Sequence, residues 1–271
     1  MSDEVHHLSM GIWVVFLALA TAAIGSYVGI ACARRAAYAA SRQRLWMLLA
    51  ALAIGGTAFW LSNIVTMAGF SVDGSAIRFD STRVVASLFL CMAAALVGLL
   101  ISTPREAVES RPSTDAVIVR LMSAAVVMGL GLTLGYYFAM KAIEVQGRTY
   151  MDGALIAVAA VIAVLASLGV LWMASADVSR PVLAGGSLAV AVAPVLMHMA
   201  MMAALRVRLD PTATIPAGSE VFAILFPAFV VSMLILIVPI VALLMAPDRA
   251  TAELEAQAQA WVQQEAQQRQ H

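Results

Sequence analysis

The sequence predicts an all-α, polytopic membrane protein built as a bundle of seven transmembrane helices. Hydrophobic residues make up 62% of the 271-residue chain and charged residues only 12%, about half the charged share of a soluble domain. The mean hydropathy is +0.92. Seven apolar runs meet the roughly 20-residue length that a helix needs to cross a bilayer.

Short linkers separate the runs, so one bundle is expected rather than several domains. Their Ala, Leu, Val and Gly composition favours helices over barrel strands, which are shorter and alternate in polarity. The runs are Ser9–Cys32, Trp46–Ala68, Val84–Ser102, Arg120–Met140, Ala154–Ser175, Val182–Leu205 and Phe222–Ala246. We therefore expect an N-terminus over 1–8, one membrane domain over 9–246, and a polar helical tail over 247–271.

The first run, the glycines and the cysteines all fit the assignment to membrane-spanning helices. The N-terminus lacks the basic region of a cleavable signal, so the first run is expected to be retained. Small residues at GxxxG spacing in the first run and a glycine cluster in the fourth are typical of close helix packing in lipid. Cys32 and Cys91 lie in separate apolar runs and are expected to be free thiols. The glycines are Gly25, Gly29, Gly129, Gly131 and Gly135.

Basic residues predict the orientation, because cytoplasmic loops carry more Lys and Arg. The first linker holds four arginines and no acidic residue, so we place it in the cytoplasm, with the N-terminus outside and the C-terminus inside. The cytoplasmic set is Arg34, Arg35, Arg42, Arg44, Arg105, Arg111, Arg120, Arg180, Arg249 and Arg269. The outer set is Arg78, Arg83, Lys141, Arg148, Arg206 and Arg208. Runs two, four and six then all end at the outer surface.

The sixth run ends in a stretch that combines a histidine with methionines, from Pro194 to Leu205. On a helix, Met197, Met201, His198 and Met202 share one face, while Met199 points elsewhere. Imidazole and thioether ligands suit copper, especially Cu(I). Methionine also fills gaps in apolar packing, so core packing is the competing interpretation.

A repeat links this stretch to two earlier runs. When Asn63, Tyr136 and His198 are aligned, a methionine follows four residues later in each case. These methionines are Met67, Met140 and Met202. Because the three runs all point outward, we expect the three segments to lie at similar depth.

The pattern resembles the MHYT family of bacterial integral membrane sensor domains, which carry Met-His-Tyr-Thr-type motifs at the outer ends of alternate helices. The third motif keeps Met197, His198 and Met202, with Met199 in place of tyrosine. The second keeps Tyr137 and Met140, with Gly135 and Tyr136 in place of Met-His. The first keeps Trp60 and Met67, with Ser62 and Asn63 in place of Met-His.

The resemblance implies a copper site near the outer face that senses oxygen, carbon monoxide or nitric oxide. The expected ligands are His198, Met197, Met202, Met140 and Met67, and the expected lining residues are Asn63, Tyr136, Tyr137 and Met201. His6 and His7 could supply further ligands. The alternative is a member without metal, in which Asn63 and Tyr136 bond each other or His198 in a polar network. Lys141 and Glu144 are expected to form a pair on the fourth helix.

No phosphate-binding loop, HExxH motif or nucleophile–base pair is present in the sequence, so we expect no enzyme activity. Balanced charge, with 16 basic and 16 acidic residues, does not suggest nucleic acid as a partner. We expect a sensor in the bacterial cytoplasmic membrane that signals to a partner through its tail, with a homodimer as one arrangement. The alternatives are a small-solute transporter and a structural membrane subunit that binds partners without a ligand.

Overall fold

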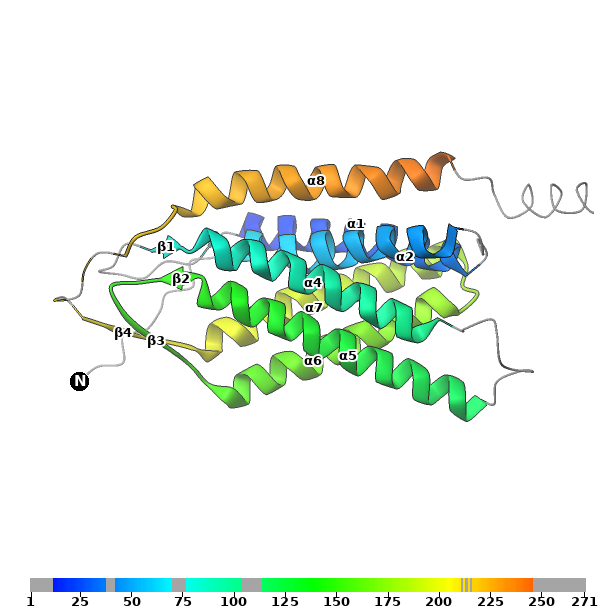
Figure 1. Cartoon of the computed structure of the whole chain (residues 1–271), viewed down its shortest axis with the longest axis horizontal. Helices are drawn as coiled ribbons and strands as arrows, with labels where there is room; N and C mark the ends of the chain where they lie inside the picture. Colours follow the sequence, from blue (N-terminus) through cyan, green and yellow to red (C-terminus); the bar gives the residue numbers. More distant parts are fainter. Residues whose placement is uncertain are drawn as a thin grey trace, which may run out of the picture. The chain divides into compact units, whose positions relative to one another are not determined.

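The computed structural model describes residues 12–37, 42–69, 77–103, 114–210, 212, 214 and 216–245. Within these residues lie seven helical segments long and apolar enough to cross a membrane, as the sequence predicts (Figure 1). They are α1 (Ile12–Ala36), a composite second span (Gln43–Met67), α4 (Ser81–Ser102), α5 (Thr114–Lys141), α6 (Gly153–Ser175), α7 (Arg180–Ala204) and α8 (Val221–Met245). The chain is therefore a multi-pass membrane protein.

Helices α4 and α6 begin before the predicted apolar runs do, because an aspartate caps each of their first turns. Asp80 precedes α4 and accepts hydrogen bonds from the backbone amides of Thr82 and Arg83 at 2.9 and 3.2 Å. Asp152 caps α6 in the same way through the amide of Ala154, at 2.8 Å. Such caps satisfy amides that have no partner within the helix.

The second span is the central helix of the bundle. It consists of α2 (Gln43–Ala51), the π-helix η2 (Leu52–Leu61) and α3 (Ser62–Met67). In its most apolar stretch of 18 residues, 89% of the residues are buried. Small residues allow this enclosure. At Gly55 a side chain would collide with the backbone of α4 at Cys91. A helix that is apolar on all sides belongs in the interior of a bundle, and here α1 and α4 pack directly on η2.

Two short β-ribbons join the loops at one end of the bundle (Figure 1). Strand β1 (Arg78–Phe79) pairs antiparallel with β2 (Ile143–Glu144), and β3 (Gly147–Met151) pairs antiparallel with β4 (Leu205–Leu209). An isolated bridge connects Phe79 to Ser219. The loops after α3, α5 and α7 therefore meet, so the C-terminal ends of these helices lie at one end of the bundle. This agrees with the predicted alternation of the spans, although the sequence analysis expected only linkers here.

The charged residues follow the same division into two ends. All six residues of the predicted outer basic set lie at the ribbon end, on β1, β3, β4 and the helix ends beside them. At the other end, Arg34 pairs with Asp177 at 3.2 Å. The N-out orientation itself stays a prediction from the basic residues.

Helix packing agrees with the predicted roles of the glycines and cysteines. A side chain at Gly25 would collide with the backbone of Ala58, and one at Gly129 with the backbone of Val164. Both positions thus allow the close helix approach expected in lipid. Cys32 and Cys91 are buried and free, as predicted.

The chain divides into two compact units, residues 1–239 and 240–271. Of the second unit, the described part is Ile240–Met245, the end of α8. The predicted tail over 247–271 and the predicted N-terminus over 1–8, with His6 and His7, lie outside the described residues.

Candidate functional site

The three residues aligned by the repeat are buried inside the helix bundle, each on a different span. Asn63 is 1% exposed on α3, Tyr136 is fully buried on α5, and His198 is 1% exposed on α7. The Nδ1 atom of His198 and the Oδ1 atom of Asn63 are 2.9 Å apart and hydrogen-bonded. This bond joins the second and sixth spans directly. Asn63, which occupies the position of a motif histidine, is therefore the partner of the one histidine that the motifs keep.

Tyr136 links the fourth span to the other two through backbone carbonyls. Its hydroxyl donates to the carbonyl of Phe59 at 2.9 Å, and a longer contact of 3.5 Å reaches the carbonyl of Pro194. Phe59 lies four residues before Asn63, and Pro194 lies four residues before His198. The tyrosine thus meets both partner helices one turn before their aligned residues. The predicted polar network is confirmed for Asn63 and His198, whereas Tyr136 bonds the backbone instead of either side chain.

The π-helix η2 carries the carbonyl that Tyr136 uses. Its neighbour Trp60 is 3% exposed and donates from Nε1 to the Ser87 hydroxyl at 2.8 Å, with a longer contact to the Val84 carbonyl at 3.3 Å. Trp60 therefore attaches η2 to α4. Isolated π-helical segments often occur at functional sites, and this one lies directly beside the aligned residues.

Cys91 is a neighbour of the network that the sequence analysis did not include. It is fully buried on α4, and a side chain at Gly135, next to Tyr136, would collide with its sulfur. Neither apolar run by itself shows that Gly135 faces Cys91. The only sequence signal for this contact is that the cysteine of the third run lies at the same depth as the second motif.

The methionines of the predicted site are all buried, and the predicted helix face is confirmed in α7. Met197 and Met201 are fully buried, and Met202 is 6% exposed, whereas Met199 is only half-buried. Met140 on α5 and Met67 on α3 are 1% and 2% exposed. Thioethers from three spans thus lie in the interior at the same end of the bundle as His198.

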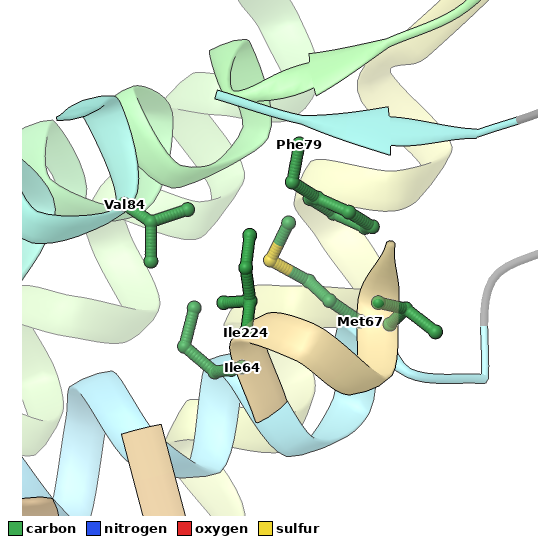
Figure 2. A pocket seen from close by; sticks show the side chains of 6 residues that line it. Ile64, Met67, Phe79, Val84 and Ile224 are labelled. Carbon is green, nitrogen blue, oxygen red and sulfur yellow. The ribbon is translucent and has the colours of Figure 1, made fainter. Parts of the chain in front are cut away.

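Met67 also borders a small apolar pocket between α3, β1, α4 and the start of α8 (Figure 2). Its cavity volume is about 10 Å³, close to the space that one water requires. Its lining residues are Ile64, Met67, Phe79, Val84, Val221 and Ile224. All of them are apolar, so this pocket supplies no polar group to a ligand.

Tyr137 and Lys141 lie at the edge of the site. Tyr137 is half-buried, and the Lys141 ammonium lies 5.8 Å from the centre of its ring, within the range of a cation–π contact. The predicted helical pair of Lys141 and Glu144 is wrong. Helix α5 ends at Lys141, and Glu144 belongs to β2, because the chain turns into a ribbon where a longer helix was expected.

The donor set limits the kind of metal that the site could take. Among the described residues, no group of three or more His, Cys, Asp or Glu side chains is placed to hold a metal ion. Any metal here would need thioether sulfur beside the imidazole of His198. That set is soft, and soft ligands select Cu(I) over harder divalent ions.

Comparison with known proteins identifies one segment of the chain. Residues 129–187 match the MHYT family, described as a bacterial signalling protein N-terminal repeat. This segment is similar to an MHYT repeat. The predicted resemblance is confirmed over this segment, which runs from the second half of α5 through α6 into α7. The MHYT match contains Tyr136 and Met140 and ends before His198.

A curated relative is similar over a wider region. An uncharacterized signalling protein of Caulobacter vibrioides is 24% identical over 173 residues, which cover 63% of this chain and 20% of that protein. The chain thus spans about a fifth of the length of this relative. No solved structure matches the chain.

Proposed function

We propose that the chain is a membrane signalling sensor whose sensing centre is the buried network of Asn63, Tyr136 and His198. The observation that carries this proposal is the hydrogen bond between His198 Nδ1 and Asn63 Oδ1, at 2.9 Å. Buried polar groups are costly unless they are paired. Three paired groups at aligned positions of three spans form a centre whose rearrangement would be felt by all three helices. The MHYT repeat and the signalling relative support this assignment.

The network fits a copper ion in one specific respect. Because an amide oxygen only accepts hydrogen bonds, Nδ1 of His198 carries the proton and Nε2 carries the lone pair. Metal-binding histidines are oriented in this way by a carbonyl or carboxylate on the other ring nitrogen. Asn63 would therefore hold the imidazole, and His198 with Met197, Met202, Met140 and Met67 would supply the ligands. Bound Cu(I) would provide a soft centre for a small diatomic ligand.

The network also has a route to the rest of the bundle through η2. Tyr136 bonds the carbonyl of Phe59, one turn after Gly56. The fully buried Ser232 of α8 makes a long contact of 3.5 Å to the Gly56 carbonyl. A ligand shifts a conformational equilibrium only by its differential affinity for two states. We propose that these states differ in η2 and that α8 carries the difference to a cytoplasmic or membrane partner. The proposed role is binding and signalling rather than catalysis.

Metal analysis of the purified full chain tests the copper proposal. After loading with Cu(I) under reducing, oxygen-free conditions, we expect about one copper per wild-type chain. Loss of an orienting partner costs about 10- to 100-fold in metal affinity, so Asn63→Leu should weaken binding by that factor, and His198→Gln should abolish it. Met202→Leu should weaken binding, whereas Met199→Leu is the matched control, because Met199 is half-buried and lies off the shared face. Equal copper in the wild type and His198→Gln would reject the metal.

A metal-free role is the second candidate, and the same hydrogen bond favours it. The bond to Asn63 gives the His198 ring a partner without any ion, so the network could serve only to hold three spans together for partner binding. In that case copper would not bind, and His198→Gln would lower stability without changing any metal content. Crosslinking of the full chain in membranes would then recover a partner equally from the wild type and from a folded His198 variant.

A further inference from the structure

One face of the β3–β4 ribbon carries a cluster of arginines. In the antiparallel register, Arg148 lies opposite Arg208, and Tyr150 lies opposite Arg206. Successive side chains of a strand alternate between faces, so these four residues share one face. All four are exposed, whereas Thr149 and Val207 on the opposite face are half-buried. The ribbon is thus two-sided, with three arginines and one aromatic ring pointing away from the protein.

Within the part of the chain that the structure describes, Arg148, Arg206 and Arg208 form no salt bridge. The salt bridges among the described residues use Arg34, Arg78 and Arg83. Two carboxylates lie at the ends of the ribbon, and one of them, Asp210, interacts electrostatically with Arg148 without forming a salt bridge. Both also accept hydrogen bonds from neighbouring residues. Asp152 accepts the amide of Ala154 at the start of α6, and Asp210 accepts both the amide and the hydroxyl of Thr212. Like charges placed directly opposite each other destabilise a ribbon, so the pair Arg148–Arg208 would be relieved by an anion.

The ribbon begins at the ends of membrane-spanning helices. Strand β4 follows α7 without a gap, and one residue separates β3 from α6. At about 3.3 Å per residue, Arg206 and Tyr150 lie within roughly 10 Å of the helix ends, and Arg208 and Arg148 within roughly 13 and 17 Å. The polar headgroup layer extends about 5–8 Å beyond the hydrocarbon core on each side. Tyrosine is enriched at this level, and Tyr150 is 51% exposed.

We propose that this face, formed by Arg148, Tyr150, Arg206 and Arg208, binds the phosphate of anionic phospholipids in the adjacent leaflet. The guanidinium group binds phosphate oxygens in a bidentate manner, and three arginines share this face of the ribbon. A soluble anion would explain the arginines but not the exposed tyrosine beside the helix ends. The site is independent of the buried network, which lies inside the bundle.

Native mass spectrometry of the purified full chain in detergent tests this proposal. The chain is titrated with phosphatidylglycerol and with phosphatidylcholine of the same acyl chains, and the wild type should bind the anionic lipid at least tenfold more tightly. Each arginine near an anionic surface contributes about 1 kcal/mol, or roughly fivefold. Arg206→Gln should therefore weaken binding about fivefold, and the triple variant R148Q/R206Q/R208Q on the order of 100-fold. The matched control is Arg44→Gln, an exposed arginine at the opposite end, which should bind like the wild type.

Three results would overturn the proposal. Equal binding of the two lipids by the wild type would remove the charge preference. A loss in Arg44→Gln equal to that in Arg206→Gln would show attraction by net charge rather than by the ribbon. Glycerol phosphate that binds the wild type as tightly as the lipid, and loses affinity in the triple variant, would identify a soluble anion as the ligand. A melting temperature equal to or above that of the wild type shows that the triple variant is folded, as expected when repulsion between Arg148 and Arg208 is removed.

Discussion

Breaking the bond between Asn63 and His198 from both sides at once should cost less than the sum of the costs of breaking it from each side. We consider Asn63→Leu, which keeps the approximate shape of the amide, and His198→Phe, which keeps a ring. Each single change leaves one buried polar group without its partner, and both positions are 1% exposed. The double variant removes both groups, so neither is left unpaired.

The size of this coupling follows from the burial and the bond length. A buried donor or acceptor left unsatisfied costs about 1–3 kcal/mol. Hydrogen bonds within membrane proteins give smaller couplings, about 0.6 kcal/mol on average and about 1.7 at most. At 2.9 Å between Nδ1 and Oδ1, with both groups enclosed by helices, we expect a coupling in the upper half of that range. The double variant should be about 1–1.7 kcal/mol more stable than the two single costs would sum to.

The assay is reversible unfolding of the copper-free full chain in mixed micelles, followed by circular dichroism. A control cycle combines Asn63→Leu with Ser187→Ala. Ser187 bonds the Leu183 carbonyl of its own helix and lies about three turns before His198. This control pair should be additive within about 0.3–0.5 kcal/mol. If the Asn63–His198 cycle were additive within the same limit, the bond would not hold the two spans together, and the network could not be the centre of a sensor.

Three further changes test neighbouring features by the same unfolding assay. Tyr136→Phe removes the hydroxyl bonded to η2 at 2.9 Å and should lower the free energy of unfolding by about 0.5–1.5 kcal/mol. The control Tyr137→Phe, at a half-buried ring, should lower it by less than about 0.5 kcal/mol. Equal losses in the two variants would contradict the role of Tyr136. Gly135→Ala drives a methyl group into the packed thiol of α4 and should cost about 1–3 kcal/mol, whereas Gly153→Ala, which meets open space, should be neutral or stabilising. Asp80→Ala removes the cap of α4 and should cost about 1 kcal/mol, most of which Asp80→Asn should restore.

Residue periodicity and chemistry predicted the spans and the members of the network for identifiable reasons. Spanning length and apolar composition fixed the seven segments, because a bilayer leaves few alternatives for a buried backbone. The repeat placed Asn63, Tyr136 and His198 at one level, and the pairing of Asn63 with His198 follows from the need of buried polar groups for partners.

The remaining features depend on how neighbouring elements meet. The π-helix η2 has the same kind of composition as an ordinary membrane helix, so neither its π-helical turns nor the bond between its Phe59 carbonyl and Tyr136 could be predicted from the sequence. The pairing of Arg148 with Arg208 depends on a ribbon whose strands lie more than 50 residues apart in the chain. Hydropathy does not predict which strands pair over such a separation. Glu144 was assigned to a helix for the same reason. A strand begins there because β1 offers a partner.

The contacts of the three aligned residues differ because their side chains differ in length, while their helices run in the same direction. Side chains on a helix lean toward its N-terminus, so the long tyrosine reaches a point one turn earlier on its neighbours, at the carbonyls of Phe59 and Pro194. The shorter Asn63 and His198 meet at their own level. A histidine at position 136 is shorter and lacks the hydroxyl that contacts these carbonyls, so Tyr136→His should lose both contacts. Tyr136 therefore ties α5 to the backbones of η2 and α7 and leaves the side-chain pair to Asn63 and His198, and a Tyr136→His variant that bound copper more tightly than the wild type would show that the tyrosine at this position limits metal binding.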